Sequence, residues 1–301
     1  MTSSVSAIIV NFNAGCLLDQ CISSLQACHE IKEIVIVDNA SSDTSLESLA
    51  DLSRVKIVKN SRNLGFATAC NIGLENVVFN YVLFFNPDGV ITPDALNNML
   101  TCLNTHPKIG MVGGQLINPD GTEQAGGRRA VPTPWRSFVR AFGLHHLENR
   151  WPKLFFDFHL HNQALPDHPI EVEAISGACM LVKQQALRDV GLWDEGYFLH
   201  CEDLDWCMRF RQKGWKIMFV PDAKIMHKQG HCGRSRPIFV EFHKHKGMVR
   251  FYKKFFRHQY PGLLMGLVSF GVWFRFFLIA AYFLMTRCLS HRLSSCFNSN
   301  Q

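Results

Sequence analysis

Short apolar runs rich in β-branched and aromatic residues alternate with helical patterns between residues 5 and 85. The runs that predict strands are 5–10, 33–37, 55–59 and 81–85, and the spacing that predicts helices covers 16–28 and 66–76. Strands that alternate with helices form a mainly parallel sheet with helices on both faces. The sequence therefore predicts an α/β fold with a Rossmann-like, mixed but mainly parallel sheet.

Polar side chains follow three of these runs. They are Asn11 and Asn13 after the first run, Asp38 after the second, and Asn86 with Asp88 after the fourth. Because ligands of such sheets bind at the carboxyl ends of the strands, these side chains mark a predicted nucleotide site. The first run is not followed by Gly-x-Gly-x-x-Gly, which argues against an ordinary dinucleotide site.

Asp38, at the end of Glu-Ile-Val-Ile-Val, has two interpretations. Its carboxylate can accept hydrogen bonds from a base N–H group or from ribose hydroxyls. It can equally form a turn within Asp-Asn-Ala-Ser-Ser-Asp, because Asx and Ser side chains favour turns. The residue alone leaves both interpretations open.

The turn Asn86-Pro87-Asp88-Gly89 follows the fourth apolar run. A carboxylate at a strand end can bind Mg²⁺ or Mn²⁺ while diphosphate oxygens fill other coordination positions. The alternative is a plain turn, which these four residues also form well. Taken alone, the pattern favours the turn.

A stretch from residue 191 to residue 211 is rich in acids and aromatics and contains the adjacent carboxylates Glu202 and Asp203. A sugar hydroxyl is a poor nucleophile until a base removes its proton, and a positioned Asp suits this task. The alternative is helix capping, because both acids suit the first turn of a helix. His227 follows the next predicted strand, at 216–220, where it can ligate a metal or serve as a local hydrogen-bonding residue.

These motifs occur in the order strand–Asp, strand–Asn-Pro-Asp-Gly, Gly-x-Trp-Asp-Glu, Glu-Asp-x-Asp-x-x-x-Arg and strand–Pro-x₅-His. The order resembles inverting family 2 glycosyltransferases with the GT-A fold, roughly over residues 4–250. It resembles most the bacterial rhamnosyltransferase-like members that build surface polysaccharides. The segment 63–73 also matches that subgroup's Asn-x-Gly-Phe-Ala-x-x-x-Asn-x-Gly pattern.

The resemblance implies a role for each matched residue. Asp203 acts as the catalytic base with Glu202 beside it, while Asp88 and His227 hold a Mg²⁺ or Mn²⁺ ion. Asn86 stands where the family's Asp-x-Asp metal motif has its first Asp. The residues implied to contact substrates are Asn11, Asn13, Asp38, Asn63, Gly65, Asn86 and, on the acceptor side, Trp193, Asp194 and Glu195.

The resemblance also implies transfer of a sugar with inversion from a nucleotide-sugar donor to a lipid-linked or saccharide acceptor hydroxyl, in cell-surface polysaccharide synthesis. Rhamnose from dTDP-rhamnose is the first choice, and galactofuranose, glucose and N-acetylglucosamine are alternatives. A nucleotidyltransferase-like enzyme would need a basic, Gly-rich loop near the N-terminus, which the sequence lacks. A non-catalytic membrane scaffold disagrees with the retained Asp88, Glu202, Asp203 and His227.

Charge is distributed unevenly along this chain of net charge +6, since residues 229–301 carry 11 Lys and Arg against one acid. Residues 262–285 are apolar apart from Arg275, and about 20 apolar residues cross a bilayer. This tail favours an anionic membrane over nucleic acid as a partner. A re-entrant hairpin, an in-plane helix and a buried core hairpin are the alternatives to a membrane span.

The sequence predicts a GT-A domain over 1–242, in which residues 126–170 form a mobile or acceptor-facing segment, and a membrane-associated helical tail over 243–301. The polar N-terminus lacks a basic segment, so no signal peptide is expected. The 11 cysteines show no Cys-x-x-Cys pair, as in reduced cytosolic proteins. We therefore expect a location on the cytoplasmic face of the inner (cell) membrane, either peripheral or with one C-terminal hydrophobic segment.

Overall fold

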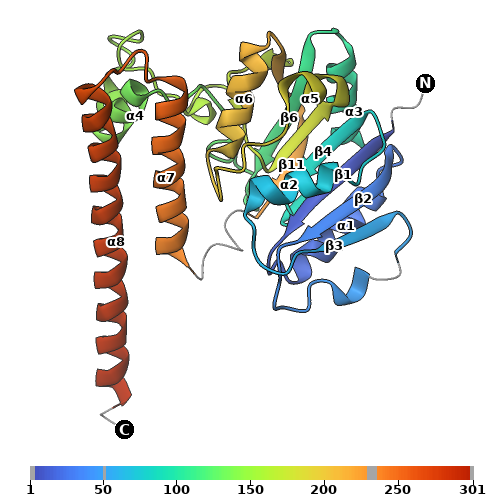
Figure 1. Ribbon diagram of the computed structural model, residues 1–301, viewed down its shortest axis with the longest axis horizontal. Helices are drawn as coiled ribbons and strands as arrows, with labels where there is room; N and C mark the ends of the chain where they lie inside the picture. The colour runs from blue at the N-terminus through green and yellow to red at the C-terminus, as the bar shows by residue number, and fades with distance from the viewer. Residues whose placement is uncertain (1–3, 50–51, 229–235, 299–301) are drawn as a thin grey trace. The chain divides into compact units, whose positions relative to one another are not determined.

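The computed structural model describes residues 4–49, 52–228 and 236–298, with side chains up to residue 286. The chain divides into two compact units (Figure 1). The sheet unit comprises residues 1–198 and 202–232, and the helical unit comprises 199–201 and 233–301. The predicted domain boundary after residue 242 falls inside helix α7 (Pro237–Phe255), so the domain division stays a prediction.

The described part of the sheet unit contains a nine-stranded sheet with the order β3-β2-β1-β4-β10-β6-β11-β5, in which β8 pairs with β11. Its strands are β1 (Val5–Asn11), β2 (Ile31–Asp38), β3 (Val55–Lys59), β4 (Tyr81–Phe85), β5 (Gly89–Ile91), β6 (Ile109–Ile117), β8 (Ile170–Glu171), β10 (Cys179–Lys183) and β11 (Lys216–His227). The strands β7 (Arg128–Arg129) and β9 (Ala174–Ile175) form a separate small sheet.

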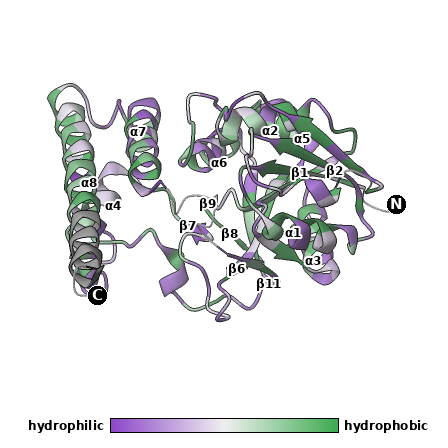
Figure 2. Ribbon diagram, turned by 90° about the horizontal axis from the view of Figure 1, so that it is seen from below, coloured by the Kyte–Doolittle hydropathy of each residue, from purple (hydrophilic) through white to green (hydrophobic). Residues whose placement is uncertain are grey.

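Helices cover both faces of the large sheet. They are α1 (Cys16–Gln26), α2 (Phe66–Leu74), α3 (Pro93–Asn104), α5 (Gln184–Val190) and α6 (Glu202–Gln212). The unit also contains α4 (Pro134–Ala141) and the short 3₁₀ helices η1 (Glu47–Leu49), η2 (Leu144–Leu147) and η3 (Leu160–Asn162). Figure 2 shows α1 and α3 on one side of the sheet and α2, α5 and α6 on the other.

Strand pairing follows the predicted mixed pattern. β1 lies parallel to β2 and β4, β2 lies parallel to β3, and β6 lies parallel to β11. β10 is antiparallel to both β4 and β6, and the short β5 and β8 are antiparallel to β11. The predicted mixed sheet flanked by helices is therefore confirmed.

Successive side chains of a strand point to opposite faces of the large sheet, so each face has its own apolar core. Val5, Ala7 and Ile9 of β1 belong to the buried cluster that includes the apolar faces of α1 and α3. On the opposite face, Phe84 of β4 contacts the ring of Trp206 from α6, with ring centroids 5.2 Å apart. Because both faces are covered, the strands read as nearly continuous apolar runs.

No predicted element covers α3 or β6, and the predicted strand at 216–220 is shorter than β11. Strand β6 contains glycines, which lower strand propensity, and they permit close packing: a Cβ on Gly114 would lie 2.2 Å from Ile225 Cδ1. Pro221, which cannot donate a ladder hydrogen bond, directly follows the predicted strand at 216–220. In the structure the pairing with β6 shifts register between Val220 and Lys224 and then continues to His227.

The helical unit contains α7 and the long helix α8 (Leu263–Asn298). Arg275, the one charge within the apolar run, is paired inside this unit, since its Nη1 lies 3.0 Å from His245 Nε2. The His245 ring nitrogen Nδ1 in turn lies 2.7 Å from the Glu241 carbonyl oxygen. Phe242 of α7 contacts Trp273 and Phe276 of α8.

The segment Leu263–Thr286 of α8 is 24 residues long with a mean hydropathy of 2.0 and is 11% buried. Its length and composition are those of a helix that crosses a membrane. An apolar core helix of a soluble protein passes the same test but is mostly buried. This helix thus provides a candidate membrane anchor.

Gly65, before α2, gives a test of the fold. It has φ +87° and ψ 170°, and a Cβ here would lie 2.6 Å from the Phe198 carbonyl oxygen, which accepts a hydrogen bond from Phe66 N–H at 2.8 Å. We expect Gly65→Ala to lower the free energy of unfolding by about 1–3 kcal/mol or more. Gly126→Ala, with φ +85° but open space around it, should cost less. Equal losses in urea unfolding would show that the close contact is unimportant.

Candidate functional site

The carboxyl ends of four strands meet at one edge of the sheet. Pairing of β1 sets Asn11 opposite Asp38 and Ile9 opposite Phe85, so the residues after β4 lie next to the end of β1. β11 is parallel to β6, and both β6 and β4 are antiparallel to β10, so the end of β11 at His227 lies at the same edge. The predicted convergence of polar side chains therefore has a structural basis.

Asn11 and Asp38 form a buried hydrogen-bonded pair at this edge. Asn11 Nδ2 donates to Asp38 Oδ1 at 2.8 Å and lies within hydrogen-bond distance of Ser41 Oγ and Ser45 Oγ. The Asp38 carboxylate also accepts from Ser41 N–H at 3.1 Å and from the Ser41 hydroxyl at 2.6 Å. Asp38 thus organises the loop that follows β2, while its predicted contact with the nucleotide stays a prediction.

Asn13 and Asn63 shape the neighbouring loops. Asn13 has φ +54°, a conformation that Asn tolerates, and its Oδ1 accepts from Ser42 N–H at 2.8 Å. Asn63 Oδ1 accepts from Gly65 N–H at 2.9 Å, and Asn39 Nδ2 donates to the Gly65 carbonyl at 3.1 Å. The predicted site residues Asn13, Asn63 and Gly65 are thereby fixed near the ends of β1 and β2.

His227, Asp88 and Asn86 form a second group at the same edge. His227 Nε2 lies 3.1 Å from Asp88 Oδ1 and 3.1 Å from Asn86 Nδ2. On the other side of the ring, Nδ1 lies 2.6 Å from Gln124 Oε1, while Gln124 Nε2 donates to the His227 carbonyl at 3.2 Å. With the Gln124 amide in this orientation, a neutral ring carries its proton on Nδ1 and directs the Nε2 lone pair at Asp88 and Asn86, whereas a protonated ring forms an ion pair with Asp88.

Asp88 and His227 fit a divalent cation. With Nε2 unprotonated, the Asp88 oxygen and this nitrogen are two acceptors 3.1 Å apart, and a cation between them relieves their repulsion. Adjacent ligands of an octahedral ion with bonds of 2.0–2.1 Å lie about 3 Å apart. Among the described residues, no group of three or more His, Cys, Asp or Glu side chains could hold a metal. The pair thus suits an ion that takes its other ligands from a diphosphate and water.

Asp203 sits at the start of α6 and is held from three sides. Its Oδ2 forms an ion pair with Arg129 Nη2 and accepts from Gly177 N–H at 3.2 Å. Its Oδ1 accepts from Leu204 N–H at 2.8 Å, so the carboxylate also satisfies a backbone N–H in the first turn of α6. Side-chain exposures of 19% for Arg129 and 13% for Asp203 make this a largely buried pair.

The groups around Asp203 and Asp88 are connected through a short backbone segment. Asn86 N–H donates to the Ala178 carbonyl at 3.0 Å, and the preceding residue, Gly177, donates to Asp203. The two residues that precede β10 (Cys179–Lys183) therefore link the turn after β4 to the start of α6. These hydrogen bonds connect Asp203 to the turn that carries Asp88 through two consecutive residues, Gly177 and Ala178.

Glu202 is a buried carboxyl beside Asp203. Burial, and next the adjacent charge of Asp203, raises the pKa of Glu202 to about 8, although Arg129 opposes the shift. Its Oε2 has no hydrogen-bond partner within the described ranges of the chain. Glu202 is therefore mainly neutral at pH 7. The adjacent carboxyls of Glu202 and Asp203 together then carry one negative charge instead of two.

The predicted acceptor-side residues join α2 to the segment before α6. Asn71 Nδ2 donates to the Trp193 carbonyl at 3.0 Å and to Glu195 Oε1 at 2.8 Å, and Asn71 Oδ1 accepts from Trp193 N–H. The Trp193 ring is buried against Phe66, Phe84 and Trp206. Asp194 Oδ1 accepts from Gly196 N–H at 2.9 Å. These contacts give Trp193 a packing role, and the acceptor contacts stay predictions.

Three residues that complete the site were not singled out as site residues from the sequence. They are Arg129, which pairs with Asp203, Gln124, which orients His227, and Asn71, which holds Trp193. Arg129 and Gln124 lie far from their partners in sequence, so no local spacing points to them. Asn71 stands within the matched Asn-x-Gly-Phe-Ala-x-x-x-Asn-x-Gly pattern, and that signal was available.

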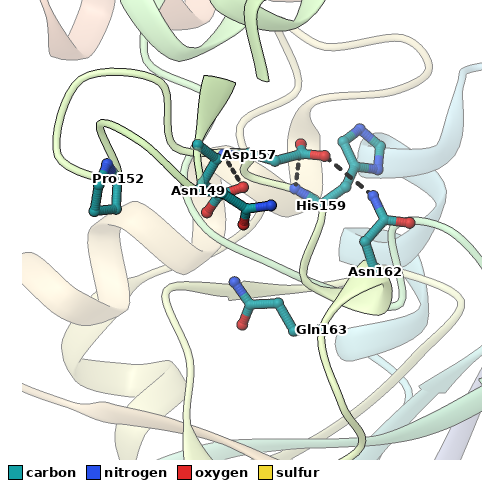
Figure 3. Close-up of a pocket in the computed structure, with 7 residues that line it drawn as sticks. Asn149, Pro152, Asp157, His159, Asn162 and Gln163 are labelled. Atoms are coloured by element: carbon teal, nitrogen blue, oxygen red, sulfur yellow. Dashed lines mark hydrogen bonds between the residues drawn. The ribbon is translucent and has the colours of Figure 1, made fainter. Parts of the chain in front are cut away.

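A polar pocket of about 470 Å³ lies within residues 148–163 (Figure 3). The carboxylate of Asp157 accepts from Arg140 Nη1 at 2.6 Å, from His159 N–H at 3.0 Å and from Asn162 Nδ2 at 3.1 Å. Burial, helped by the charge of Arg140, lowers the pKa of His159 to about 4, so this ring is neutral at pH 7. Such a wall of amides and carboxylates suits hydroxyl-rich ligands.

The pocket is fastened close to the Asp203 site. The backbone of His159 forms a β-bridge with Arg129, and Arg128 Nη2 donates to the Gln163 carbonyl at 3.0 Å. The residue that contacts Asp203 therefore also contacts the wall of the pocket.

Comparison with known sequences gives consistent matches. A sequence model of Glycosyl transferase family 2 matches residues 6–190. The chain is 27% identical over 265 residues to N-acetylglucosaminyl-diphospho-decaprenol L-rhamnosyltransferase of Mycobacterium tuberculosis, covering 83% of this chain and 84% of that protein. It is 25% identical over 264 residues to the dTDP-rhamnosyl transferase RfbF of Shigella flexneri, covering 84% and 78% of the two chains.

Solved structures are similar in fold. GalNAc-T7 with UDP, GalNAc and Mn²⁺ matches with a TM-score of 0.60 and 19% identity over 84% of this chain, which spans about half (48%) of that chain. The mannosyltransferase PcManGT from Pyrobaculum calidifontis, in complex with GDP-Man and Mn²⁺, matches with a TM-score of 0.56 and 17% identity over 85% of this chain and 65% of that one. These likenesses support the predicted fold and carry no further argument.

The raised pKa of Glu202 predicts a pH-dependent stability. Its folded-state pKa of about 8 exceeds the ordinary value of 4.5, so the folded state holds the proton more tightly between these pH values. The carboxyl therefore contributes stability that is present below about pH 4.5 and is lost as the pH rises through about 8. We expect Glu202→Gln to be more stable than the wild type at pH 8.5, by up to a few kcal/mol, with little difference at pH 5.

Urea unfolding at pH 5, 7 and 8.5 measures this difference. The control is Glu75→Gln, at an exposed carboxyl, which should leave the stability profile unchanged. A Glu202→Gln profile parallel to that of the wild type would mean that the carboxyl is ionised in the folded state.

Proposed function

Because this chain belongs to glycosyl transferase family 2, we propose that it transfers rhamnose from dTDP-rhamnose, with inversion, to a hydroxyl of a lipid-linked saccharide during cell-surface polysaccharide synthesis. The donor and acceptor are inferred from the two rhamnosyltransferase relatives, which match most of their own length. The polar pocket beside Arg129 is consistent with a saccharide acceptor.

The observation that carries the proposal is the linkage of Asp203 to the Asp88–His227 pair at one edge of the sheet. A transfer of this kind needs a base near the acceptor and charge neutralisation near the leaving diphosphate. The start of β10 sets these two functions side by side.

Asp203 takes the proton from the acceptor hydroxyl, whose oxygen attacks the anomeric carbon from the face opposite the diphosphate. The bond from this carbon to the diphosphate oxygen breaks, and the electron pair leaves with the nucleotide. Arg129 and the Gly177 N–H group keep the carboxylate of Asp203 in place, as an orienting group does for a catalytic base. Because Glu202 is mainly neutral, it adds no second negative charge beside the base Asp203.

Asp88 and His227 would hold a Mg²⁺ or Mn²⁺ ion, which supplies positive charge for the diphosphate when bound. Asn86, Asp38, Asn11 and Asn13 would contribute contacts to the nucleotide. The apolar α8 would anchor the chain at the cytoplasmic face of the inner (cell) membrane, where a lipid-linked acceptor is presented.

Transfer itself tests the proposal. The wild type, incubated with dTDP-rhamnose and a polyprenyl-diphosphate-linked N-acetylglucosamine, should yield a product heavier by one rhamnose. Asp203→Asn should reduce transfer by about 10²–10⁴-fold because the base is lost, while binding of dTDP measured by calorimetry should persist. The exposed Asp222→Asn is the control and should retain transfer.

Two outcomes of this assay would count against different parts of the proposal. Absence of product from the wild type, with product from another nucleotide-sugar, would reject rhamnose as the donor sugar. Near wild-type transfer by Asp203→Asn would reject Asp203 as the base.

Metal binding can be tested separately from transfer. Mn²⁺ titrated with dTDP should give an electron paramagnetic resonance signal of bound metal that is lost in Asp88→Asn. Gln124→Ala should weaken Mn²⁺ binding by about 10–100-fold, because Gln124 fixes the ring tautomer and orientation of His227. The exposed Gln185→Ala is the matched control. Unchanged Mn²⁺ affinity in Asp88→Asn would place the ion elsewhere.

A further inference from the structure

Helix α4 presents its aromatic side chains outward. Trp135, Phe138 and Phe142, at the C-cap, follow one helical face and are 41%, 45% and 68% exposed. Their rings form a continuous row, with centroids 5.6 Å apart between Trp135 and Phe138 and 4.5 Å apart between Phe138 and Phe142. Pro134 and Val139 are buried on the other side of the helix.

The arginines of the same helix form ion pairs with the sheet unit. Arg136 Nη1 binds Glu173 Oε2 at 2.8 Å, and Arg140 Nη1 binds Asp157 Oδ2 at 2.6 Å. A surface helix ordinarily directs its charges to water and its large apolar side chains to the core. In α4, by contrast, Arg136 and Arg140 form ion pairs with neighbouring acids, while the three aromatic rings are exposed to solvent.

The segment after α4 extends the same apolar surface. Leu147, Trp151 and Leu154 are 39%, 49% and 49% exposed, and Trp135 Nε1 donates to the Leu154 carbonyl at 2.8 Å. This hydrogen bond ties the segment to the aromatic row. We call the six residues the aromatic patch: Trp135, Phe138, Phe142, Leu147, Trp151 and Leu154.

Two exposed cations accompany the aromatic patch. Arg150 lies over the Trp151 ring at 5.2 Å, and Lys153 is exposed beside Leu154 in sequence. Neither forms an ion pair with any residue that the structure describes. Exposed Trp and Phe with basic neighbours are the composition of a surface that lies in the headgroup region of an anionic membrane.

We propose that the aromatic patch of the sheet unit inserts into the interfacial region of an anionic lipid bilayer. This contact is separate from the apolar helix α8 and would hold the sheet unit itself against the membrane surface. Arg129, the partner of Asp203, lies on β7 shortly before α4, so the segment that carries the patch also carries part of the site. The lipid contact can be tested without measuring transfer. The result of that test is therefore independent of the proposed reaction.

A lipid surface fits the patch better than a second copy of the chain. A two-fold contact joins identical surfaces, so Arg150 and Lys153 of one copy would face those of the other. Anionic headgroups instead complement both cations. The indole rings of Trp135 and Trp151 also favour the boundary between headgroups and acyl chains.

Tryptophan quenching by doxyl-labelled lipid tests the insertion in the full chain. Trp273→Phe first removes the tryptophan of α8. In this background, vesicles that contain anionic phosphatidylglycerol and a shallow doxyl lipid should quench the fluorescence. Adding Trp135→Phe and Trp151→Phe should reduce the quenched fraction several-fold. Quenching that persists without these two tryptophans would overturn the proposal.

Variants of two other patch residues, Phe138 and Phe142, give an independent measurement. In the Trp273→Phe background, Phe138→Ser with Phe142→Ser should reduce quenching of the retained tryptophans several-fold, with an unchanged unfolding temperature because both side chains are exposed. The matched control changes two exposed apolar residues outside the patch, Val78→Ser and Leu192→Ser, and should leave quenching unchanged.

Two further results would reject the lipid contact. One is equal quenching in the Phe138/Phe142 and control variants. The other is a dimer in solution that dissociates in the Phe138/Phe142 variant while vesicles quench nothing, which would assign the patch to a second copy.

Discussion

The parallel register of β1, β2 and β4 is the constraint on which the site depends. It sets Asn11 opposite Asp38 and sets the turn at Asn86 beside the end of β1. Parallel strands bring their carboxyl ends to one edge, where ligands of open α/β sheets bind. The antiparallel β10 then returns along β4, and the two residues just before it, Gly177 and Ala178, connect this edge to α6.

The acids gathered at this edge would repel one another without nearby partners. Asp203 is held by Arg129, Asp38 by Asn11 and Ser41, and the raised pKa of Glu202 leaves that carboxyl mainly neutral. Asp88 faces Nε2 of His227, which carries no proton when the ring is neutral and its proton lies on Nδ1 beside Gln124. The acids at this edge are therefore partly compensated by partners within the chain.

The chain has two apolar surfaces, one on α8 and one on and after α4, and their charged residues are paired in different ways. In the helical unit, Arg275 is paired with His245, so the one charge within the apolar segment of α8 is not left without a partner. In the sheet unit, α4 turns its arginines to Glu173 and Asp157 and leaves aromatic rings outside. Composition alone identified the first surface as apolar and gave no sign of the second.

The sequence by itself determined the strands up to β4, the polar residues at their ends, the acid pair at the start of α6 and the order of motifs that identified the family. These signals are local, because they depend on side-chain period, turn chemistry and helix capping over a few residues. The tertiary structure alone decided that Arg129 pairs with Asp203, that Gln124 orients His227 and that Asn71 holds Trp193, across 74, 103 and 122 residues. It also decided that β11 continues past Pro221 and that the rings of α4 face outward. These contacts depend on which elements pack against one another, and the spacing of nearby residues in the sequence does not predict them.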